Sequence, residues 1–276
     1  MLTEEQKIAR MNGLGASDSP IIMGYSSYKT PYQLYLEKTG LADSDYEETE
    51  QQYWGNALER AIVARFERDN DVKVTFPDTI HHPDYPFILA NLDGWIESEN
   101  AVLEIKCCNV FQRKSWDTST SDGMPMAYLI QLAKQVAVSN ADKGYCAVLI
   151  GGCEYMQFTY ERDRALEELI IESDKEFWHK VQNRIEPDPS NVSDCRLKYS
   201  NVIETKTVHA NYRTAKCLEE LLDIKAEIKQ LNLAEDAAKM QLMEHMKDAE
   251  YLVGLEGEIL ATWKANKKGT RVLNIK

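Results

Sequence analysis

The residues of this sequence that could do chemistry together are two acids and a lysine, Asp93, Glu104 and Lys106. Glu104 and Lys106 alternate with the apolar Leu103 and Ile105 in a stretch typical of a β-strand. Because side chains alternate along a strand, Glu104 and Lys106 share one face, and pairing with the preceding segment would bring Asp93 beside them. Such hard oxygen ligands suit Mg²⁺ bound together with substrate phosphate oxygens. The chemistry predicted is phosphodiester hydrolysis.

The alternative is an ordinary ion pair on an exposed sheet face. Glu-x-Lys also occurs at residues 5–7, 204–206 and 227–229, where solvated charges are the simplest interpretation. Glu104 differs in context, because it is flanked by apolar residues in a strand where a lone charge is expensive to bury. From the pattern alone, both interpretations stay open.

Hydrophobic periodicity predicts the elements that must position these residues. The polar link at residues 98–100 is short enough to make the segment ending near Ile96 and the segment 101–107 antiparallel neighbours. Helices are expected at 30–40, 54–68, 125–139 and 166–181, and further strands at 72–76, 88–92, 144–150 and 155–160.

The helix expected at 125–139 carries a polar stripe opposite its apolar face. Tyr128, Gln131 and Gln135 form the stripe, at i, i+3 and i+7. Such a stripe usually forms the solvated side of an amphipathic helix, and this is the prediction from periodicity alone.

The order of the elements predicts an α/β (α+β) fold, with a central mixed sheet flanked by helices. A cluster of breaking residues at 186–190 is the best candidate boundary. We therefore expect a core of residues 1–190 and an extension of residues 191–276. Within the extension, apolar spacing from Leu221 to Leu242 predicts a long helix, and alternation at 251–263 and 271–275 predicts a terminal hairpin.

Composition narrows the function classes. Lys and Arg number 32 and Asp and Glu 45, giving a net charge of −13, which disfavours a protein that coats duplex DNA with a wholly basic surface. Six cysteines lack the paired spacing of a zinc or iron–sulfur site and are interpreted as reduced thiols. The acidic start and the lack of a long apolar run predict a cytoplasmic protein with no membrane association.

Six ordered blocks of sequence resemble the YqaJ-type viral recombinase family, which is related to lambda exonuclease and has the PD-(D/E)xK, restriction-endonuclease-like nuclease fold. Together the blocks cover about residues 8 to 160. They are Arg10 with 13–17, then 28–31 with 37–40, 55–59, 92–94, 104–107 and 128–131. Six blocks in order are far more specific than one short motif.

The resemblance implies a metal-binding catalytic site. Asp93 and Glu104 match the family's metal-binding carboxylates, and the backbone carbonyl of Ile105 matches a further ligand. Lys106 matches the lysine that orients the attacking water or stabilises charge on phosphorus, and Glu59 would supplement the site from its helix. The implied metal is Mg²⁺, with Mn²⁺ as a substitute.

The resemblance also implies a pocket for a 5′-terminal phosphate. Arg10 matches the arginine that receives this phosphate, Ser17 matches a hydroxyl beside it, and Gln131 matches the glutamine that closes the pocket. An arginine can bind phosphate bidentately, and residues 17–20 resemble a helix start, whose free amides attract anions.

The function expected from the resemblance is Mg²⁺-dependent 5′-to-3′ digestion of linear double-stranded DNA ends, which leaves 3′ single strands for recombination by strand annealing in a phage or prophage setting. Expected partners are two further copies in a homotrimer ring and a single-strand annealing protein. The alternatives are a structure-specific endonuclease of the same fold and a noncatalytic DNA-binding recombination scaffold. A Cas4-like iron–sulfur nuclease is a third, disfavoured because a clustered cysteine quartet is absent from the sequence.

Overall fold

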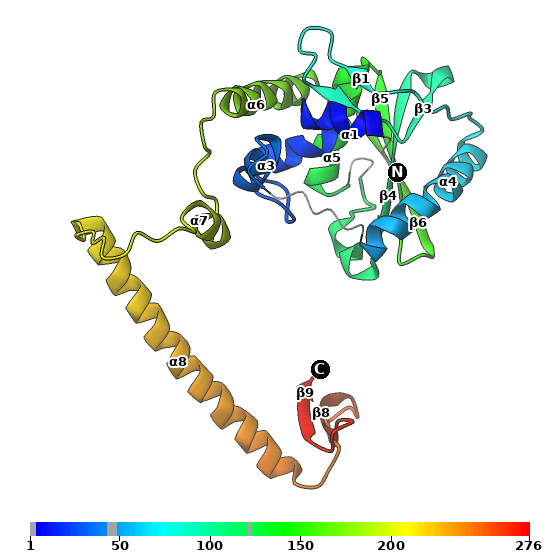
Figure 1. The fold of residues 1–276 in the computed structure, drawn as a ribbon. Helices are drawn as coiled ribbons and strands as arrows, with labels where there is room; N and C mark the ends of the chain where they lie inside the picture. Colours follow the sequence, from blue (N-terminus) through cyan, green and yellow to red (C-terminus); the bar gives the residue numbers. More distant parts are fainter. Residues whose placement is uncertain (1–3, 43–48, 121–122) are drawn as a thin grey trace. The chain divides into compact units, whose positions relative to one another are not determined.

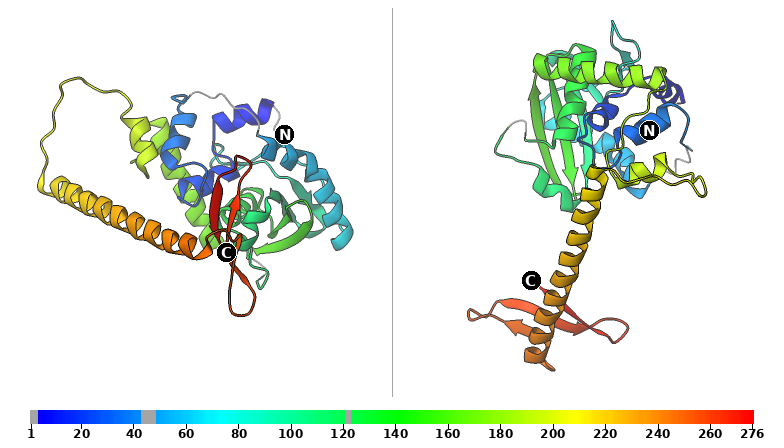
Figure 2. Two further views of the ribbon diagram at one scale, coloured as in Figure 1. Left: turned by 90° about the horizontal axis from the view of Figure 1, so that it is seen from below. Right: turned by 90° about the vertical axis from the view of Figure 1, so that its left-hand side faces the viewer.

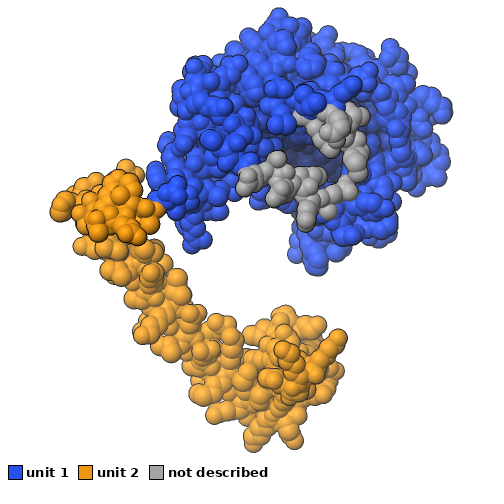
Figure 3. Space-filling view, viewed as in Figure 1, with its two compact units in different colours: residues 1–201 blue, residues 202–276 orange. Residues whose placement is uncertain are grey.

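The computed structural model describes residues 4–42, 49–120 and 123–276. The chain divides into two compact units, Met1–Asn201 and Val202–Lys276 (Figure 3). Each unit is described by itself below.

The first unit contains α-helices, short 3₁₀ turns and six strands (Figure 1). Its helices are α1 (Glu4–Met11), α2 (Ser19–Ile22), α3 (Pro31–Lys38), α4 (Glu50–Asn70), α5 (Met126–Ser139), α6 (Arg164–Gln182) and α7 (Val192–Lys198), with 3₁₀ turns η1 (Ala16–Asp18), η2 (Glu97–Glu99) and η3 (Val110–Ser115). Its strands are β1 (Ile80–His81), β2 (Leu89–Ala90), β3 (Gly94–Ile96), β4 (Ala101–Cys108), β5 (Lys143–Ile150) and β6 (Glu154–Glu161).

The central sheet has the strand order β3-β4-β5-β6. β3 and β4 are antiparallel, β4 and β5 are parallel, and β5 and β6 are antiparallel, so the sheet is mixed. α5 lies in the connection between the two parallel strands, as parallel pairing requires. The predicted fold class and the predicted pairing across residues 98–100 are confirmed.

Helices cover both faces of this sheet (Figure 1). On one face, Leu103 and Ile105 of β4 pack in a cluster with Phe66 of α4. On the other face, Val102 of β4 packs in a cluster with Ile130 of α5. Glu104 lies between Leu103 and Ile105 in the strand, so its side chain points to the face opposite theirs, as predicted, and this is the face that α5 covers.

The predicted helices form, and local capping explains two of their starts. The Thr30 side chain accepts a hydrogen bond from the backbone of Gln33 at α3, and Thr49 does the same for Gln52 at α4. Residues 17–20, expected as a helix start, form the end of η1 and the beginning of the short α2.

The strand predicted at residues 72–76 is wrong. Only Thr75 pairs there, in an isolated bridge with Trp95. The Val72 amide instead donates to the backbone carbonyl of Glu67, and the Val74 amide donates to the Glu67 side chain. These two amides therefore bond to the end of α4 and not to a neighbouring strand. The strand predicted at 88–92 is shorter than expected, since only β2 forms within it.

The second unit consists of the long α8 (Tyr212–Met246) and a three-stranded sheet of β7 (Tyr251–Val253), β8 (Ile259–Ala265) and β9 (Arg271–Ile275) (Figure 2). The long helix is confirmed, and β8 and β9 form the expected hairpin. The single strand expected at 251–263 is wrong, because a turn separates β7 from β8 and the two pair with each other.

The break between the units falls after α7, whereas the sequence placed the boundary before it. Asp194 of α7 accepts a hydrogen bond from the Thr30 hydroxyl at 2.8 Å, and the Lys198 ammonium lies 3.2 Å from the Glu186 carboxylate. These contacts join α7 to the first unit.

No helix in the described part of the chain is long and apolar enough to cross a membrane.

Candidate active site

Asp93 lies immediately before β3, next to Glu104 of β4. Gly94, the first residue of β3, pairs with Leu103, so the residue before the strand comes close to Glu104. An Asp93 carboxylate oxygen accepts a hydrogen bond of 2.8 Å from the Ile105 amide. The side chain of Glu104 is only 2% exposed. The structure therefore brings together the two carboxylates that the sequence singled out.

Three side chains donate hydrogen bonds to the Glu104 carboxylate. The Lys106 ammonium lies 2.5 Å from Oε1, the Gln131 amide lies 2.6 Å from the same oxygen, and the Gln135 amide lies 2.6 Å from Oε2. Lys106 also donates to the Gln131 carbonyl oxygen at 3.1 Å. These charge-assisted bonds hold the buried carboxylate in one orientation.

The expectation that the Tyr128, Gln131 and Gln135 stripe faces water is wrong. Gln135 is fully buried, and Gln131 is partly buried against Glu104. The physical reason is that a buried carboxylate needs donors, and α5 supplies them from the face packed on the sheet. Sequence reasoning missed Gln135 as a site residue, although it lies one helical turn after Gln131 and so shares its face.

Burial and the neighbouring charges shift the pKa values of Asp93 and Lys106. Burial raises the pKa of Asp93 well above its usual range, and the neighbouring Glu104 carboxylate raises it further, while Lys106 opposes the effect. Burial alone would lower the pKa of Lys106, but the Glu104 and Asp93 charges outweigh it and keep the ammonium protonated.

Glu59 approaches the same site from α4. It is partly buried, and its charge also raises the pKa of Asp93. The family resemblance predicted a supplementary carboxylate from this helix, at Glu59.

The donor set fits a divalent cation. Asp93, whose pKa is raised first by burial and then by the neighbouring Glu104 charge, is the kind of carboxylate that a positive ion stabilises. Mg²⁺ needs only one or two protein carboxylates, with the Ile105 carbonyl available in the strand between Glu104 and Lys106. Among the described residues, no group of three or more His, Cys, Asp or Glu side chains is placed to hold a metal.

Arg10 and Ser17 line a cleft of about 490 Å³ that Gln131 also lines. The Arg10 guanidinium donates to the Ser17 hydroxyl at 2.6 Å and lies 3.7 Å from the Asp18 carboxylate. A Cβ atom at Gly15 would lie 3.1 Å from Arg10 Nε, so glycine allows this close approach. The cleft thus connects the predicted phosphate-binding residues with Gln131, which contacts Glu104.

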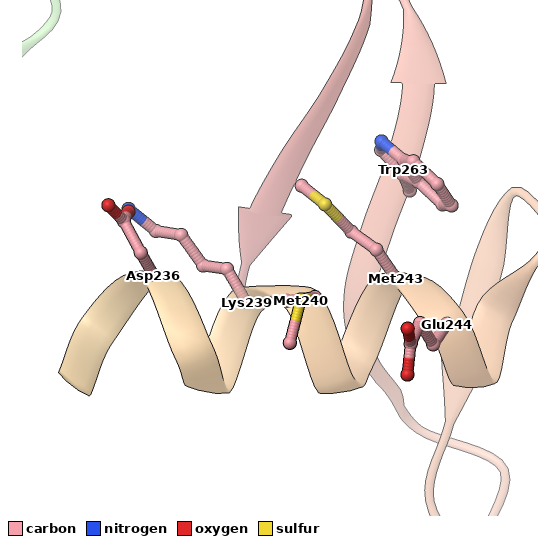
Figure 4. A pocket seen from close by; sticks show the side chains of 6 residues that line it. All are labelled: Asp236, Lys239, Met240, Met243, Glu244 and Trp263. Atoms are coloured by element: carbon pink, nitrogen blue, oxygen red, sulfur yellow. The ribbon is translucent and has the colours of Figure 1, made fainter. Parts of the chain in front are cut away.

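A second concavity, of about 530 Å³, lies within the second unit (Figure 4). Its apolar lining includes Met240 and Met243 of α8 and Trp263 of β8, which Figure 4 labels. Asp236, Lys239 and Glu244 of α8 also line it. The candidate residues Asp93, Glu104 and Lys106 lie in the first unit.

Comparisons with known proteins give the family of the chain. The YqaJ-like viral recombinase domain matches residues 7–142, a range that contains Arg10, Asp93, Glu104 and Gln131. Protein YqaJ of Bacillus subtilis (strain 168) is 34% identical over 272 residues, which cover 96% of this chain and 84% of that protein. The chain belongs to the YqaJ-like viral recombinase family.

The fold is shared with a solved nuclease. The crystal structure of an alkaline exonuclease, LHK-Exo from Laribacter hongkongensis, aligns with a TM-score of 0.55 at 24% identity, over 67% of this chain and 95% of that one. LHK-Exo in complex with dAMP aligns with the same TM-score of 0.55 at 22% identity, over 72% of this chain and 98% of that one. At these identities the likeness shows that the fold is shared.

Proposed function

We propose that this protein is a Mg²⁺-dependent exonuclease of the PD-(D/E)xK type that digests linear double-stranded DNA from 5′ ends and leaves 3′ single strands. The observation that carries the proposal is the convergence of Asp93, Glu104 and Lys106. Gln131, which donates to Glu104, also lines the cleft that contains Arg10 and Ser17. The fold shared with an alkaline exonuclease, which also has a structure in complex with dAMP, supports a nucleotide-releasing reaction.

The chemistry follows from the roles of the residues. Asp93, Glu104 and the Ile105 carbonyl would hold Mg²⁺, which supplies Lewis acidity and a low-pKa water for attack on phosphorus. Lys106 provides a fixed cation near the charge that develops on phosphorus, where preorganised groups act most strongly. Gln131 and Gln135 keep the Glu104 oxygens in place while this happens.

Polarity would come from the other end of the cleft. Arg10 and Ser17 form a cationic and hydroxyl pair that suits a terminal phosphate. A phosphate held there would set which linkage reaches the carboxylates, so the enzyme would act on 5′-phosphorylated ends. Arg10→Ala should then remove the preference for 5′-phosphorylated over 5′-hydroxyl duplex, and equal rates on both ends by the unmodified protein would contradict this part.

The catalytic part is tested by Glu104→Gln and Lys106→Met, assayed with Mg²⁺ on linear duplex. Each should lower the rate by at least about 100-fold, the order seen when one preorganised stabilising group is removed. Glu168→Gln, an exposed carboxylate on α6, is the matched control and should leave the rate unchanged. Undiminished digestion by the Glu104 variant would defeat the assignment.

We further propose that the working form is a ring of three copies that delivers 3′ strands to a single-strand annealing protein. A ring would reconcile a net charge of −13 with DNA binding, since only its lining need be basic. Sedimentation equilibrium should give a trimer mass, and a monomer at micromolar concentration would contradict the ring.

A further inference from the structure

A buried ion pair lies away from the two carboxylates of the proposed site. The Lys134 ammonium of α5 and the Asp174 carboxylate of α6 are 2.6 Å apart, and both side chains are 0% exposed. Lys134 also donates to the backbone carbonyls of Leu14 at 3.0 Å and Gly15 at 2.9 Å. The three ammonium hydrogens therefore have three acceptors, so the charge is fully satisfied.

The ion pair holds both ends of one short segment. The segment runs from Leu14 to Ser19. Lys134 donates hydrogen bonds to its first two carbonyls, and Asp174 accepts one of 2.9 Å from the Ser19 hydroxyl at its end. Between these two points lies Ser17, which contacts Arg10. The segment that carries Ser17, on the proposed phosphate-binding side of the cleft, is thus held against α5 by Lys134 and against α6 by Asp174.

The same helix holds the other side of the cleft. Gln131 and Gln135 of α5 contact Glu104, and Lys134 lies between them in sequence. One turn of α5 therefore fixes the carboxylate end of the site through two glutamines and the phosphate end through one lysine. A shift of Lys134 would change the span between the two ends.

Stability alone does not explain such a pair. Replacing a buried ion pair by apolar side chains of similar volume is often neutral or stabilising, whereas removing one partner is strongly destabilising. Hydrogen bonds to two carbonyls and a carboxylate are directional, so they specify where the segment lies. The ion pair is therefore better explained as a device that fixes the position of this segment than as a source of stability.

We propose that Lys134, held by Asp174, is a positioning residue that sets the phosphate-binding end of the cleft at a fixed distance from the catalytic carboxylates and so confers selection of 5′-phosphorylated ends. This inference rests on the proposed function. Lys134 contacts neither Asp93 nor Glu104, and it is not proposed to contact DNA. It acts through the segment that carries Ser17.

The test compares Lys134→Met, Asp174→Asn and the double variant Lys134→Met/Asp174→Leu, which removes both charges and keeps volume. The double variant should melt near the temperature of the unmodified protein. Its rate on 5′-hydroxyl duplex should stay within about threefold, while the rate ratio between 5′-phosphate and 5′-hydroxyl ends falls to about 1, through a higher KM for phosphorylated ends. Asp174→Asn, which keeps the shape and both carbonyl contacts, should lower the ratio less.

A surface ion pair on α6 provides the matched control. Glu172 and Lys175 are 2.6 Å apart and partly exposed, so Glu172→Gln/Lys175→Met should leave the ratio unchanged. A well-folded double variant of Lys134 and Asp174 that keeps the full phosphate preference would overturn the proposal. So would a loss of both rates in parallel with the melting temperature, which would indicate a purely structural role.

Amide hydrogen exchange separates this proposal from the proposed function. The Gly15 amide donates to the Asp18 carboxylate at 2.9 Å, and the Asp18 amide donates to the Gly15 carbonyl at 3.0 Å. Both amides should exchange faster in the double variant, even if the unmodified protein proves inactive or indifferent to end phosphate. Unchanged exchange would overturn the positioning role, whereas equal rates on both ends by the unmodified protein would defeat phosphate recognition.

Discussion

At the scale of residues, the site depends on which side chains donate hydrogen bonds to the buried Glu104 carboxylate. The alternation of Glu104 and Lys106 with Leu103 and Ile105 was enough to predict which face they share, because strand geometry fixes it. Gln135 could not be predicted in the same way, since a polar stripe looks alike whether it faces water or a buried charge. Only the packing of α5 on the sheet decides between the two.

Replacing Gln135 by Leu should weaken the site without unfolding the protein. One Glu104 oxygen would lose its only α5 donor, so the carboxylate would be less well oriented for a cation. We expect a roughly 10–100-fold loss of activity and a higher Mg²⁺ requirement, the usual size for a group that orients a metal ligand. A Mg²⁺ titration of the rate measures this, and an unchanged curve would contradict it.

Asp93→Asn should stabilise the metal-free protein at neutral pH while abolishing activity. The pKa of Asp93 is raised in the folded state, first by burial and then by Glu104, above its ordinary value of 3.8. The unfolded state therefore loses this proton first, and the aspartate destabilises the fold as pH rises from about 4 through the folded pKa. The Asn variant removes that effect.

Thermal unfolding in EDTA from pH 4 to pH 8 checks this sign. The variant's advantage in melting temperature should be absent near pH 4 and grow toward neutral pH, because the unmodified carboxylate is then forced to ionise. A variant that is less stable at every pH would show that Asp93 has another role in the folded protein.

At the scale of elements, caps and periodicity predicted most helices and long strands. Thr30 and Pro31 begin α3, and the strand ladder of β4 extends over the predicted segment. The failure at residues 72–76 has a local cause, since alternation was present but the Val72 and Val74 amides bond to Glu67 near the end of α4. A sequence pattern cannot show which partner a backbone group will find.

Gly94→Ala tests how closely β3 must approach its surroundings to place Asp93. A Cβ at Gly94 would lie 2.5 Å from Val74 Cγ1, closer than packed carbons allow. We expect a stability loss of about 1–3 kcal/mol, typical of overpacking, together with lower activity. Adding Val74→Ala should restore much of both in urea unfolding and rate assays, and a double variant no better than Gly94→Ala would contradict the steric explanation.

At the scale of the whole molecule, the proposed chemistry resides in the first unit. The residues of the site and the three clusters of buried apolar side chains lie before residue 202. The sequence predicted a separate C-terminal part but assigned α7 to it, because Pro187 and Pro189 mark a loop without revealing which contacts follow it.

A chain ending at Asn201 should therefore retain Mg²⁺-dependent hydrolysis of linear duplex, within about tenfold of the full chain if the second unit contributes only to association or processivity. The rate per active site measures this, and gel-filtration mass reports any change of assembly. Loss of all hydrolysis by a folded, truncated protein would place part of the active site in the second unit.

The central claim is that Asp93, Glu104 and Lys106 hydrolyse phosphodiester linkages from a DNA end with a divalent cation. The most direct measurement follows digestion of end-labelled linear duplex and closed circular duplex side by side, with Mg²⁺ or with EDTA, reading product sizes over time. The account predicts small nucleotide products from linear DNA in Mg²⁺, intact circles, no reaction in EDTA and no reaction by Glu104→Gln. Cleavage of closed circles, or digestion that continues in EDTA or in the variant, would contradict it.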